Sequence, residues 1–332
     1  MESSTKPLSE DEISTAPLIN QIQDVFQIVS NSKYKGVEGV LKIESSAADL
    51  GPTVGVTLCT HGNEIAGLGP LIHYLRNNRL KKLLQTGSVI FTINNLLAAR
   101  GFFTSSSEEE RNRLRSIDCN MNRLPKDVIK LVKNGRYEIQ RTLELYPVFK
   151  EFNAALDIHS TQTLSIPMIV EVKKGLRYLR GASISTVITN MLNVQRGLPV
   201  SALYGGIENK DIPVIGIESG TQGDETSFIH ATRILQAFLQ NFRMIPGIPQ
   251  EDGRSKRDIY RIARPILFPD KTYKFVEPFG IFQPVEKGQI LANGDGNPIV
   301  SPQKGHILFP NLRSSFDPRK DEAGFISDQV RK

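Results

Sequence analysis

The stretch "GVTLCTHGNEIAG", residues 55–67, changes its chemical character halfway along. Its first six residues are small, apolar or β-branched, which is typical of a strand buried on both faces of a sheet. His61 and Glu64 follow at once, and a helix-like pattern begins at Glu64. Because ligands collect beyond the carboxyl ends of the strands in an open α/β sheet, this pair lies where a functional site is expected.

Two later stretches repeat this arrangement. "AALDIHST", residues 154–161, is a predicted buried strand that ends with Asp157 and His159. "IPVIGIESG", residues 212–220, is a third predicted strand, and it ends with Glu218. Parallel strands end at the same edge of a sheet, so we expect these side chains to meet the pair that follows the first strand.

Together these strand ends supply the groups of a catalytic metal site. His61, Glu64 and His159 form the three-ligand set of a catalytic zinc ion, which leaves a fourth position open for water. Glu218 is then the remaining carboxylate, and we expect it to act as the general base beside that water. Asp157 is interpreted as a hydrogen-bond partner that orients the ligating imidazole of His159.

Each residue also has an ordinary structural interpretation. A lone His-x-x-Glu motif is more often chance than a metal site, because such motifs discriminate poorly. His159 alone could be a core histidine, and Glu218 alone could form a local cap or ion pair. The combination favours the metal site, since two of the chain's five histidines stand at predicted strand ends. The others are interpreted as structural or exposed residues: His73, His230 and His306.

Predicted strands alternate with predicted helices along most of the chain. This alternation favours an α/β fold with a mixed, largely parallel sheet and helices on both faces. Strands are predicted at residues 34–45 (at a sheet edge), 53–60, 88–94, 154–160, 166–172 and 212–219. Helices are predicted at residues 64–78, 136–153, 175–192 and 224–242. Residues 95–125 are polar and are expected to form a long loop.

The chain divides into three predicted segments. Residues 1–30 are expected to be an N-terminal tail, residues 31–250 a catalytic domain, and residues 255–332 a smaller β-rich domain. In the last segment, short β-like runs alternate with Gly and Pro, which is typical of a barrel-like sandwich. Its "NGDGNP" turn lacks the lysine that a biotinyl or lipoyl carrier would carry there, so we expect a structural or substrate-shaping role.

Composition narrows the classes of function. The chain has 332 residues, of which 39% are hydrophobic and 23% charged, as in ordinary globular proteins. No stretch of about 20 residues stays apolar, so no membrane partner is expected, and the polar N-terminus predicts a cytoplasmic protein. Two cysteines are too few for a disulfide framework. The net charge of +6 fits an anionic small-molecule substrate, while no nucleic-acid-binding motif is visible.

A second motif is rich in arginine. "RLRSIDCNMNR", residues 113–123, lies in the predicted loop, and arginines there can bind carboxylates through two hydrogen bonds. Arg111 and Arg113 are interpreted as solvated charges. In the order "THGNE", "RSIDCNMNR", "DIHST" and "IPVIGIESG", the motifs resemble those of the succinylglutamate desuccinylase/aspartoacylase family, a branch of the zinc carboxypeptidase fold. The resemblance covers roughly residues 50–245.

The resemblance implies a role for each matching residue. It implies that His61, Glu64 and His159 bind one zinc ion, and that Glu218 activates the zinc-bound water. It further implies that Arg115 polarises the scissile carbonyl, and that Asn122 and Arg123 grip a carboxylate of the substrate. One departure is the ending Asn120-Met121-Asn122-Arg123, where relatives commonly have an acidic "DLNR"-like ending.

The expected activity is hydrolysis of an amide bond, with deacylation of an N-acyl amino acid as the leading hypothesis. One alternative with the same metal centre is a zinc carboxypeptidase or amidase that acts on a peptide or a cell-wall fragment. A second alternative is a metal-binding protein without catalysis. The presence of every expected catalytic group argues against this second alternative.

Overall fold

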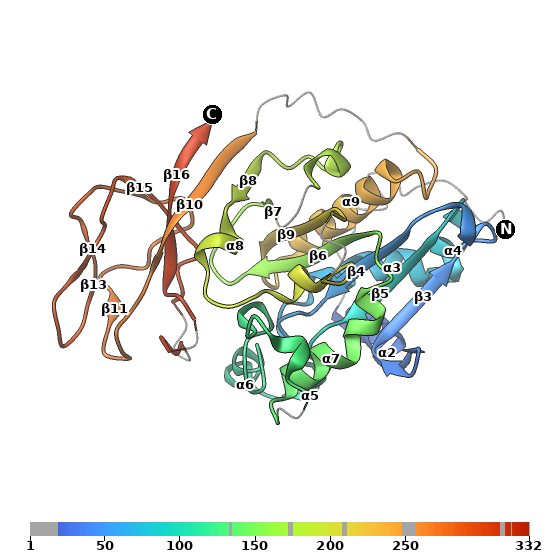
Figure 1. Ribbon diagram of the computed structural model, residues 1–332, viewed down its shortest axis with the longest axis horizontal. Coiled ribbons are helices and arrows are strands. Elements are labelled where there is room, and N and C mark those ends of the chain that lie inside the picture. The colour runs from blue at the N-terminus through green and yellow to red at the C-terminus, as the bar shows by residue number, and fades with distance from the viewer. Residues whose placement is uncertain are drawn as a thin grey trace.

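The computed structural model describes residues 19–132, 135–171, 175–207, 211–247, 257–312, 316–319 and 321–331. Within these residues the main feature is an 11-stranded mixed sheet with the strand order β12-β15-β16-β10-β8-β7-β9-β6-β4-β5-β3. Figure 1 shows this sheet running from the larger α/β part into the C-terminal strands. The mixed sheet with helices on both faces confirms the fold class that the sequence predicts.

The strands of the large sheet are β3 (Val40–Glu44), β4 (Thr53–Leu58), β5 (Ser88–Ile93), β6 (Ala154–Thr161), β7 (Met168–Glu171), β8 (Thr186–Thr189), β9 (Val214–Thr221), β10 (Asp258–Ile266), β12 (Pro284–Val285), β15 (Gly305–Leu308) and β16 (Gly324–Arg331). Two smaller groups consist of β1 (Lys33–Tyr34) with β2 (Val37–Glu38), and β11 (Lys274–Phe275) with β13 (Ile290–Asn293) and β14 (Ile299–Val300). In the centre of the large sheet, β5, β4, β6 and β9 pair in parallel, so their carboxyl ends lie at one edge.

The helices are α2 (Ile19–Asn31), α3 (Gly69–Leu75), α4 (Arg79–Leu83), α5 (Leu96–Thr104), α6 (Glu108–Arg113), α7 (Tyr137–Phe149), α8 (Met191–Val194) and α9 (Glu225–Asn241). Side chains from α2, α3, α4 and α9 pack in one hydrophobic core with one face of the sheet. Side chains from α7 pack on the opposite face in a second core. The sheet is therefore the middle of three layers.

The alternation of side chains along the strands decides which face carries the site. On β6, Leu156 and Ile158 belong to the core under α3 and α9, so Asp157 and His159 face the other side. On β9, Ile215 and Ile217 belong to the same core, so Glu218 also faces the other side. The two strands are parallel, and His159 is paired directly with Glu218. Strand register alone thus places the three polar groups side by side.

Part of the C-terminal region continues the large sheet, while β11, β13 and β14 form a smaller sheet of their own. β10 pairs in parallel with β8 and antiparallel with β16, and β15 pairs with β16. A core of its own, which includes Phe268, Phe279 and Ile307, supports the outer strands. The β-rich character predicted for residues 255–332 agrees with these strands, while the division into domains stays a prediction.

Part of the predicted N-terminal tail is a helix. Within α2, Ile22, Phe26 and Val29 are buried in the core beside α3, at the spacing of one helical face. The expectation of a tail up to residue 30 is therefore wrong from residue 19 onward, because the apolar face of α2 packs in the core against the sheet. Residues 1–18 of the predicted tail lie outside the described residues.

Two predicted elements differ from the structure. The expected loop 95–125 contains α5 and α6; Asn95 caps the first helix, and Ser107 caps the second ahead of three glutamates. Such capping chemistry favours a short helix over a loop. The helix predicted at residues 175–192 instead contains β8, whose β-branched sequence Thr-Val-Ile-Thr favours a strand.

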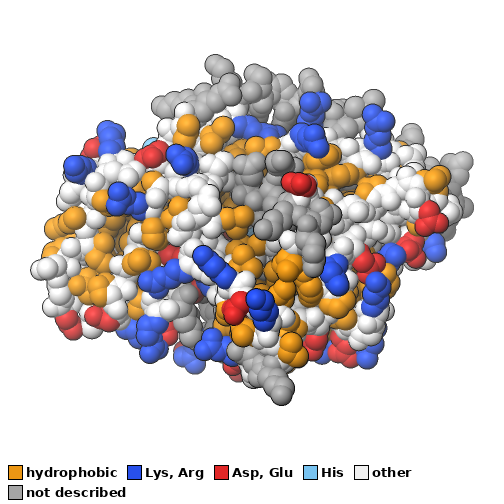
Figure 2. All heavy atoms as spheres, viewed as in Figure 1, with side chains coloured by type: hydrophobic (Ala, Val, Ile, Leu, Met, Phe, Trp, Pro, Cys, Tyr) orange, Lys and Arg blue, Asp and Glu red, His pale blue; other side chains and the backbone are white. Residues whose placement is uncertain are grey.

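In the described residues, no helix is both long and apolar enough to cross a membrane. On the face drawn in Figure 2, both Lys and Arg side chains and Asp and Glu side chains are visible, with hydrophobic side chains among them.

Candidate active site

The loop after β4 brings His61 and Glu64 together through a tight turn. The Glu64 backbone N–H donates to the His61 carbonyl at 3.0 Å, so the two side chains leave the turn on the same side. The His61 Nδ1 atom lies 2.7 Å from Glu64 Oε1. Glu64 is followed by a short 3₁₀ helix and then α3, instead of the single helix that the sequence predicts for residues 64–78.

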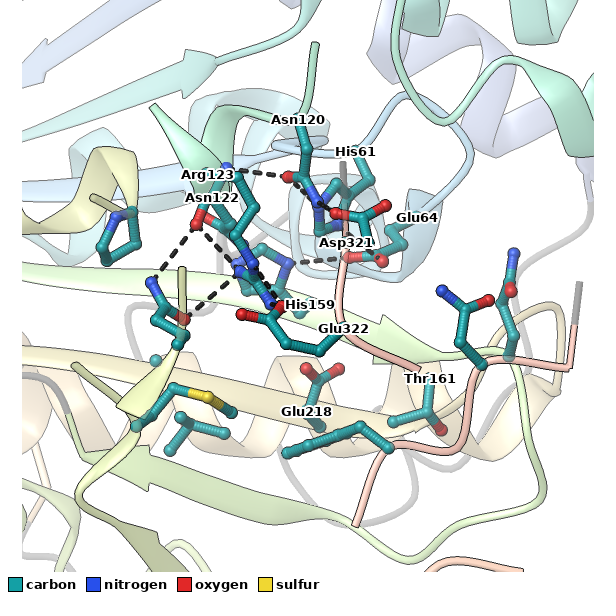
Figure 3. A pocket seen from close by; sticks show the side chains of 18 of the residues that line it. His61, Glu64, Asn120, Asn122, Arg123, His159, Thr161, Glu218, Asp321 and Glu322 are labelled. Atoms are coloured by element: carbon teal, nitrogen blue, oxygen red, sulfur yellow. Dashed lines mark hydrogen bonds and ion pairs between the residues drawn. The ribbon is translucent and has the colours of Figure 1, made fainter. Parts of the chain in front are cut away.

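His159 completes this group from the end of β6. Its Nδ1 atom lies 2.7 Å from Glu64 Oε2, so each imidazole contacts a different oxygen of the same carboxylate. The three possible ligand atoms of His61, Glu64 and His159 lie within 4.8 Å of one another, and all three residues are buried. Figure 3 shows the three side chains converging at one wall of the pocket. The structure thus brings together the residues that the sequence singled out as a metal set.

Hydrogen bonds on the outer side of each imidazole fix which nitrogen faces inward. Asn120 Oδ1 accepts the backbone N–H of Asn122 at 2.8 Å, which identifies this atom as the amide oxygen. It lies 3.0 Å from His61 Nε2, so that nitrogen must carry the proton. His159 Nε2 lies 3.1 Å from Asp157 Oδ2 and donates to it. Both imidazoles therefore present Nδ1 to Glu64, as metal-binding histidines with a fixed outer partner do.

The electrostatics of this cluster favour a cation. Burial and the Arg115 charge lower the pKa of His61 to about 4, so this imidazole is neutral. Burial acts against the Glu64 charge, but the Arg115 charge and the hydrogen bond from His159 hold the pKa of its carboxyl well below the usual range. Burial also opposes a charge on His159, yet Asp157 and Glu64 raise the pKa of its imidazole well above the usual range. Carboxylates that attract a proton to this point would also attract a metal ion.

These residues fit a zinc ion by their donor chemistry. The two Nδ1 atoms, that of His159 after it releases its proton, and one carboxylate are the ligand set of a catalytic zinc site, and each imidazole has a second partner that holds its orientation. The carboxylate of Asp157 is itself held by the hydroxyl groups of Thr57 and Thr60, at 2.6 and 3.1 Å. The site is thus built from strand ends, and the carboxylate that orients His159 is itself held by hydrogen bonds.

Glu218 lies beside this cluster and is not used by it. Its Oε2 atom is buried and has no hydrogen-bond partner among the described residues. Burial is the main cause that raises the pKa of Glu218 to about 8, with a further contribution from Glu64 and Asp157. In Figure 3 its carboxylate points into the pocket. A buried polar atom without a partner is costly, so its retention here indicates a group that meets a ligand or water.

Arg115 approaches the same cluster from the segment after α6. Its Nη1 atom donates to Glu64 Oε1, and the side chain keeps 21% of its surface exposed. The close approach of this segment depends on Gly62, whose N–H donates to the Arg115 carbonyl at 3.0 Å. A Cβ atom at Gly62 would lie 2.5 Å from the backbone of Ala98 and of Leu114. The glycine of the "THGNE" motif therefore lets two functional segments touch.

Asn122 and Arg123 also line the pocket, but their contacts differ from the expectation. Asn122 Oδ1 is buried without a hydrogen-bond partner among the described atoms. The Arg123 guanidinium is instead occupied by the carboxylate of Glu322, with Nε and Nη2 at 2.7 and 2.6 Å from Oε2. Its role as a grip for the substrate's carboxylate stays a prediction, and the structure gives it a protein partner.

Several pocket residues went unassigned in the sequence analysis. Asn120 stands inside the arginine motif, and Asp321 and Glu322 lie about 200 residues further along the chain. Asn120 Nδ2 donates to Asp321 Oδ1 at 2.8 Å, which links the two segments. The adjacent acids Asp321 and Glu322 in "KDEAG" are the only feature that could have suggested a site, and nothing in the neighbouring sequence indicates which loop they contact.

Comparison with known proteins identifies the family. Residues 50–240 match the family described as "Succinylglutamate desuccinylase/Aspartoacylase catalytic domain". Since this match spans more than half of the 332 residues, the chain belongs to that family. A search of curated protein sequences gives no match.

Solved structures share the fold at low sequence identity. A succinylglutamate desuccinylase from Chromobacterium violaceum is 17% identical, with a TM-score of 0.64 over 94% of this chain and 98% of that chain. The enzyme of the same name from Vibrio parahaemolyticus is 15% identical, with a TM-score of 0.64 over 88% and 86%. Murine aminoacylase 3 is 17% identical, with a TM-score of 0.58 over 85% and 96%. The C-terminal strands are thus included in the shared architecture.

Proposed function

We propose that the protein is a zinc-dependent amide hydrolase that removes the acyl group from an N-acyl amino acid. The observation that carries this proposal is the convergence of His61 Nδ1, His159 Nδ1 and the Glu64 carboxylate beside the unpartnered Glu218 Oε2. Membership of the family supports a deacylase. So does the shared fold with proteins named succinylglutamate desuccinylase and aminoacylase 3.

In this proposal His61, Glu64 and His159 hold one zinc ion per chain. When bound, the ion polarises the amide carbonyl and lowers the pKa of a water molecule. Glu218 accepts a proton from the attacking water and delivers it to the leaving nitrogen. Burial raises the pKa of Glu218 above its usual value, which makes its carboxylate a stronger base toward water than an exposed glutamate.

The remaining groups orient and stabilise the substrate. Arg115 is proposed to stabilise the negative charge that develops on the carbonyl oxygen, as a fixed guanidinium does in a site sheltered from water. Asn122 is proposed to hydrogen-bond the substrate through its buried Oδ1 atom, which lacks a protein partner. Arg123 is proposed to lie at the end of the substrate remote from the scissile bond. A cytoplasmic location stays a prediction from the sequence.

The test is metal analysis combined with a substrate panel. We expect about one zinc ion per chain by elemental analysis, together with hydrolysis of small N-acyl amino acids. The carboxypeptidase or amidase alternative predicts that only peptides or larger amides react. A protein without zinc, or one whose zinc-loaded form cleaves no amide in the panel, would contradict the proposal.

A further inference from the structure

A chain of buried hydrogen bonds leads from the candidate metal site into the interior of the protein. It begins at Asp157, whose Oδ2 atom accepts from His159 Nε2 at 3.1 Å. The other oxygen, Oδ1, accepts from the hydroxyl groups of Thr57 and Thr60 at 2.6 and 3.1 Å. All four residues are buried. The two oxygens of this carboxylate therefore have separate roles, since one contacts the imidazole and the protein holds the other.

Each threonine hydroxyl has a further partner that determines where its proton points. The phenol of Tyr204 donates to Thr57 Oγ1 at 3.0 Å. Asn94 Nδ2 donates to Thr60 Oγ1 at 2.8 Å and to the phenol oxygen of Tyr204 at 2.9 Å. A hydroxyl group carries only one proton, so the two threonines accept from these groups and direct their own protons to Asp157.

The direction of this chain is fixed at its inner end. Asn94 Oδ1 accepts from the Thr92 hydroxyl at 3.0 Å, which leaves Nδ2 to face Thr60 and Tyr204. Burial, with a contribution from the Asp157 charge, raises the pKa of the Tyr204 phenol well above its usual range, so the phenol keeps the proton that it donates. The donors of the chain thus point toward Asp157, and a buried network whose members are paired in this way is rigid.

Tyr204 reaches this chain from outside the parallel strands. It follows the 3₁₀ helix Val200–Leu203, and its ring packs in the second core, with its centroid 4.8 Å from that of Phe149. Thr57, in contrast, is paired directly with Asp157 across β4 and β6. A phenylalanine could fill the place of the Tyr204 ring, whereas a buried hydroxyl is costly unless it is hydrogen-bonded. The contact with Thr57 therefore gives the hydroxyl a role that ring packing does not require.

We propose that Tyr204 and Thr57 are positioning residues of the metal site, which fix Asp157 so that His159 presents Nδ1 to the ion. The inference rests on the metal ligands of the proposed function, but it does not depend on which substrate is cleaved. Loss of the outer partner of a metal-binding histidine typically weakens metal affinity by about 10-fold to 100-fold. Thr57 and Tyr204 act through that partner, so their effects should lie at or below the lower end of this range.

The experiment measures zinc affinity by competition with a chelator, so the readout does not depend on turnover. Tyr204→Phe keeps the ring and removes the hydroxyl, and its Kd for zinc should rise by about 2-fold to 10-fold, the weight of one hydrogen bond. Thr57→Val keeps the shape but removes a direct donor to Asp157, and should raise the Kd by about 10-fold. Thr57→Ser retains the hydroxyl and should bind zinc nearly as tightly as the unmodified protein.

Tyr74→Phe is the matched control. Tyr74, on α3, is as fully buried as Tyr204, but its hydroxyl has no hydrogen-bond partner among the described residues. Its removal should leave the Kd for zinc unchanged. The melting temperatures of the metal-free variants separate positioning from stability. If Tyr204→Phe lowers the melting temperature and leaves the Kd unaltered, the hydroxyl is only structural and the inference is wrong.

A double variant, Thr57→Val combined with Tyr204→Phe, tests whether the phenol acts through the threonine. Once the Thr57 hydroxyl is absent, loss of the phenol should have little further effect on the Kd, so the two effects should not add. Additive effects would show that Tyr204 acts by another route and would overturn the inference.

The outcomes also distinguish this inference from the proposed function. An unmodified protein that binds no zinc would contradict both, whereas tight zinc binding with an unchanged Kd in Tyr204→Phe would contradict the inference alone. Should Tyr204→Phe fail to fold, the two Thr57 variants still decide whether the hydroxyl chain sets the zinc affinity. An equal Kd in Thr57→Val and Thr57→Ser would then overturn the inference.

Discussion

At the scale of single residues, the site depends on which atom each side chain presents. The Nδ1 atoms of His61 and His159 face Glu64 because Asn120 and Asp157 occupy the other ring nitrogens. A metal ligand must be a neutral, correctly oriented imidazole, so these outer contacts are part of the site rather than incidental packing.

His61→Ala is expected to abolish high-affinity zinc binding, because it removes one of three ligands. Asn120→Ala should retain zinc but weaken its affinity by about 10-fold to 100-fold, which is the usual effect of losing the outer partner of a ligand. Competition with a zinc chelator measures both effects. His73→Ala, on α3, serves as the control and should bind zinc normally. Full zinc occupancy in His61→Ala would show that the ligand assignment is wrong.

Glu218→Gln is expected to keep the fold and the zinc ion but lose activity. Glutamine has nearly the same shape, yet it cannot accept the proton of water, so kcat should fall by about 10²-fold to 10⁴-fold. Zinc content, melting temperature and kcat are measured on one preparation. Glu225→Gln, at the exposed start of α9, is the matched control. Normal kcat in Glu218→Gln, on a substrate that the unmodified protein cleaves, would remove this residue from the mechanism.

Among the secondary-structure elements, α7 carries a buried carboxylate, that of Glu138, which fixes the backbone between Arg115 and Arg123. Glu138, in the first turn of α7, accepts the backbone N–H groups of Ile117, Asp118 and Cys119. It also accepts a hydrogen bond from the Asn95 side chain at 3.1 Å. This segment carries the functional residues between Arg115 and Arg123, so the helix acts as a template for their positions.

Glu138→Ala is expected to loosen this segment without removing any group from the pocket. Three backbone N–H groups would lose their acceptor, and because these residues are exposed or half-buried, each loss should cost about 0.5–1.5 kcal/mol, the net value of a hydrogen bond that water can partly replace. Hydrogen exchange at residues 117–119 should accelerate and kcat/KM should fall, while zinc stays bound. Glu144→Gln changes an exposed carboxylate on the same helix and should leave both readouts unchanged. Unaltered exchange in Glu138→Ala would refute the template role.

At the scale of the whole molecule, the pocket is assembled from parts that are distant in the chain. The candidate metal ligands come from the loop after β4 and from the end of β6. The hydrogen bond from His159 Nδ1 to Glu64 joins residues that are 95 positions apart in the sequence. The wall opposite is completed by the C-terminal segment through Asp321 and Glu322. An ion bound at the cluster therefore links segments that separate on unfolding.

Removal of zinc is expected to lower the melting temperature. A ligand that binds only the folded state stabilises it by about 2.7 kcal/mol when its free concentration is a hundredfold above Kd. Differential scanning fluorimetry with and without a chelator measures the shift. The same chelator should not affect His61→Ala, which lacks the site. A melting temperature that chelation leaves unchanged would contradict a zinc ion held by this cluster.

Local patterns along the chain were enough to predict the buried strands and the polar residues at their ends. The apolar runs of the strands predicted the sheet, because a buried strand has a recognisable composition. The polar residues that end these runs indicated His61, Glu64, His159 and Glu218 as candidates for the site. Asn95 and Ser107 also cap helices locally, so α5 and α6 form where a loop is expected from the polar composition.

The contacts between distant segments depend on how the elements pack in three dimensions. The orientation of His61 by Asn120, and the ion pair of Arg123 with Glu322, join residues separated by 59 and 199 positions. No pattern around either residue specifies such a partner, because the partner depends on how the elements pack and on which strand edge the C-terminal region joins. The strand-end residues that form the cluster could therefore be found in the sequence, whereas the partners of Asn120 and Arg123 followed from the fold.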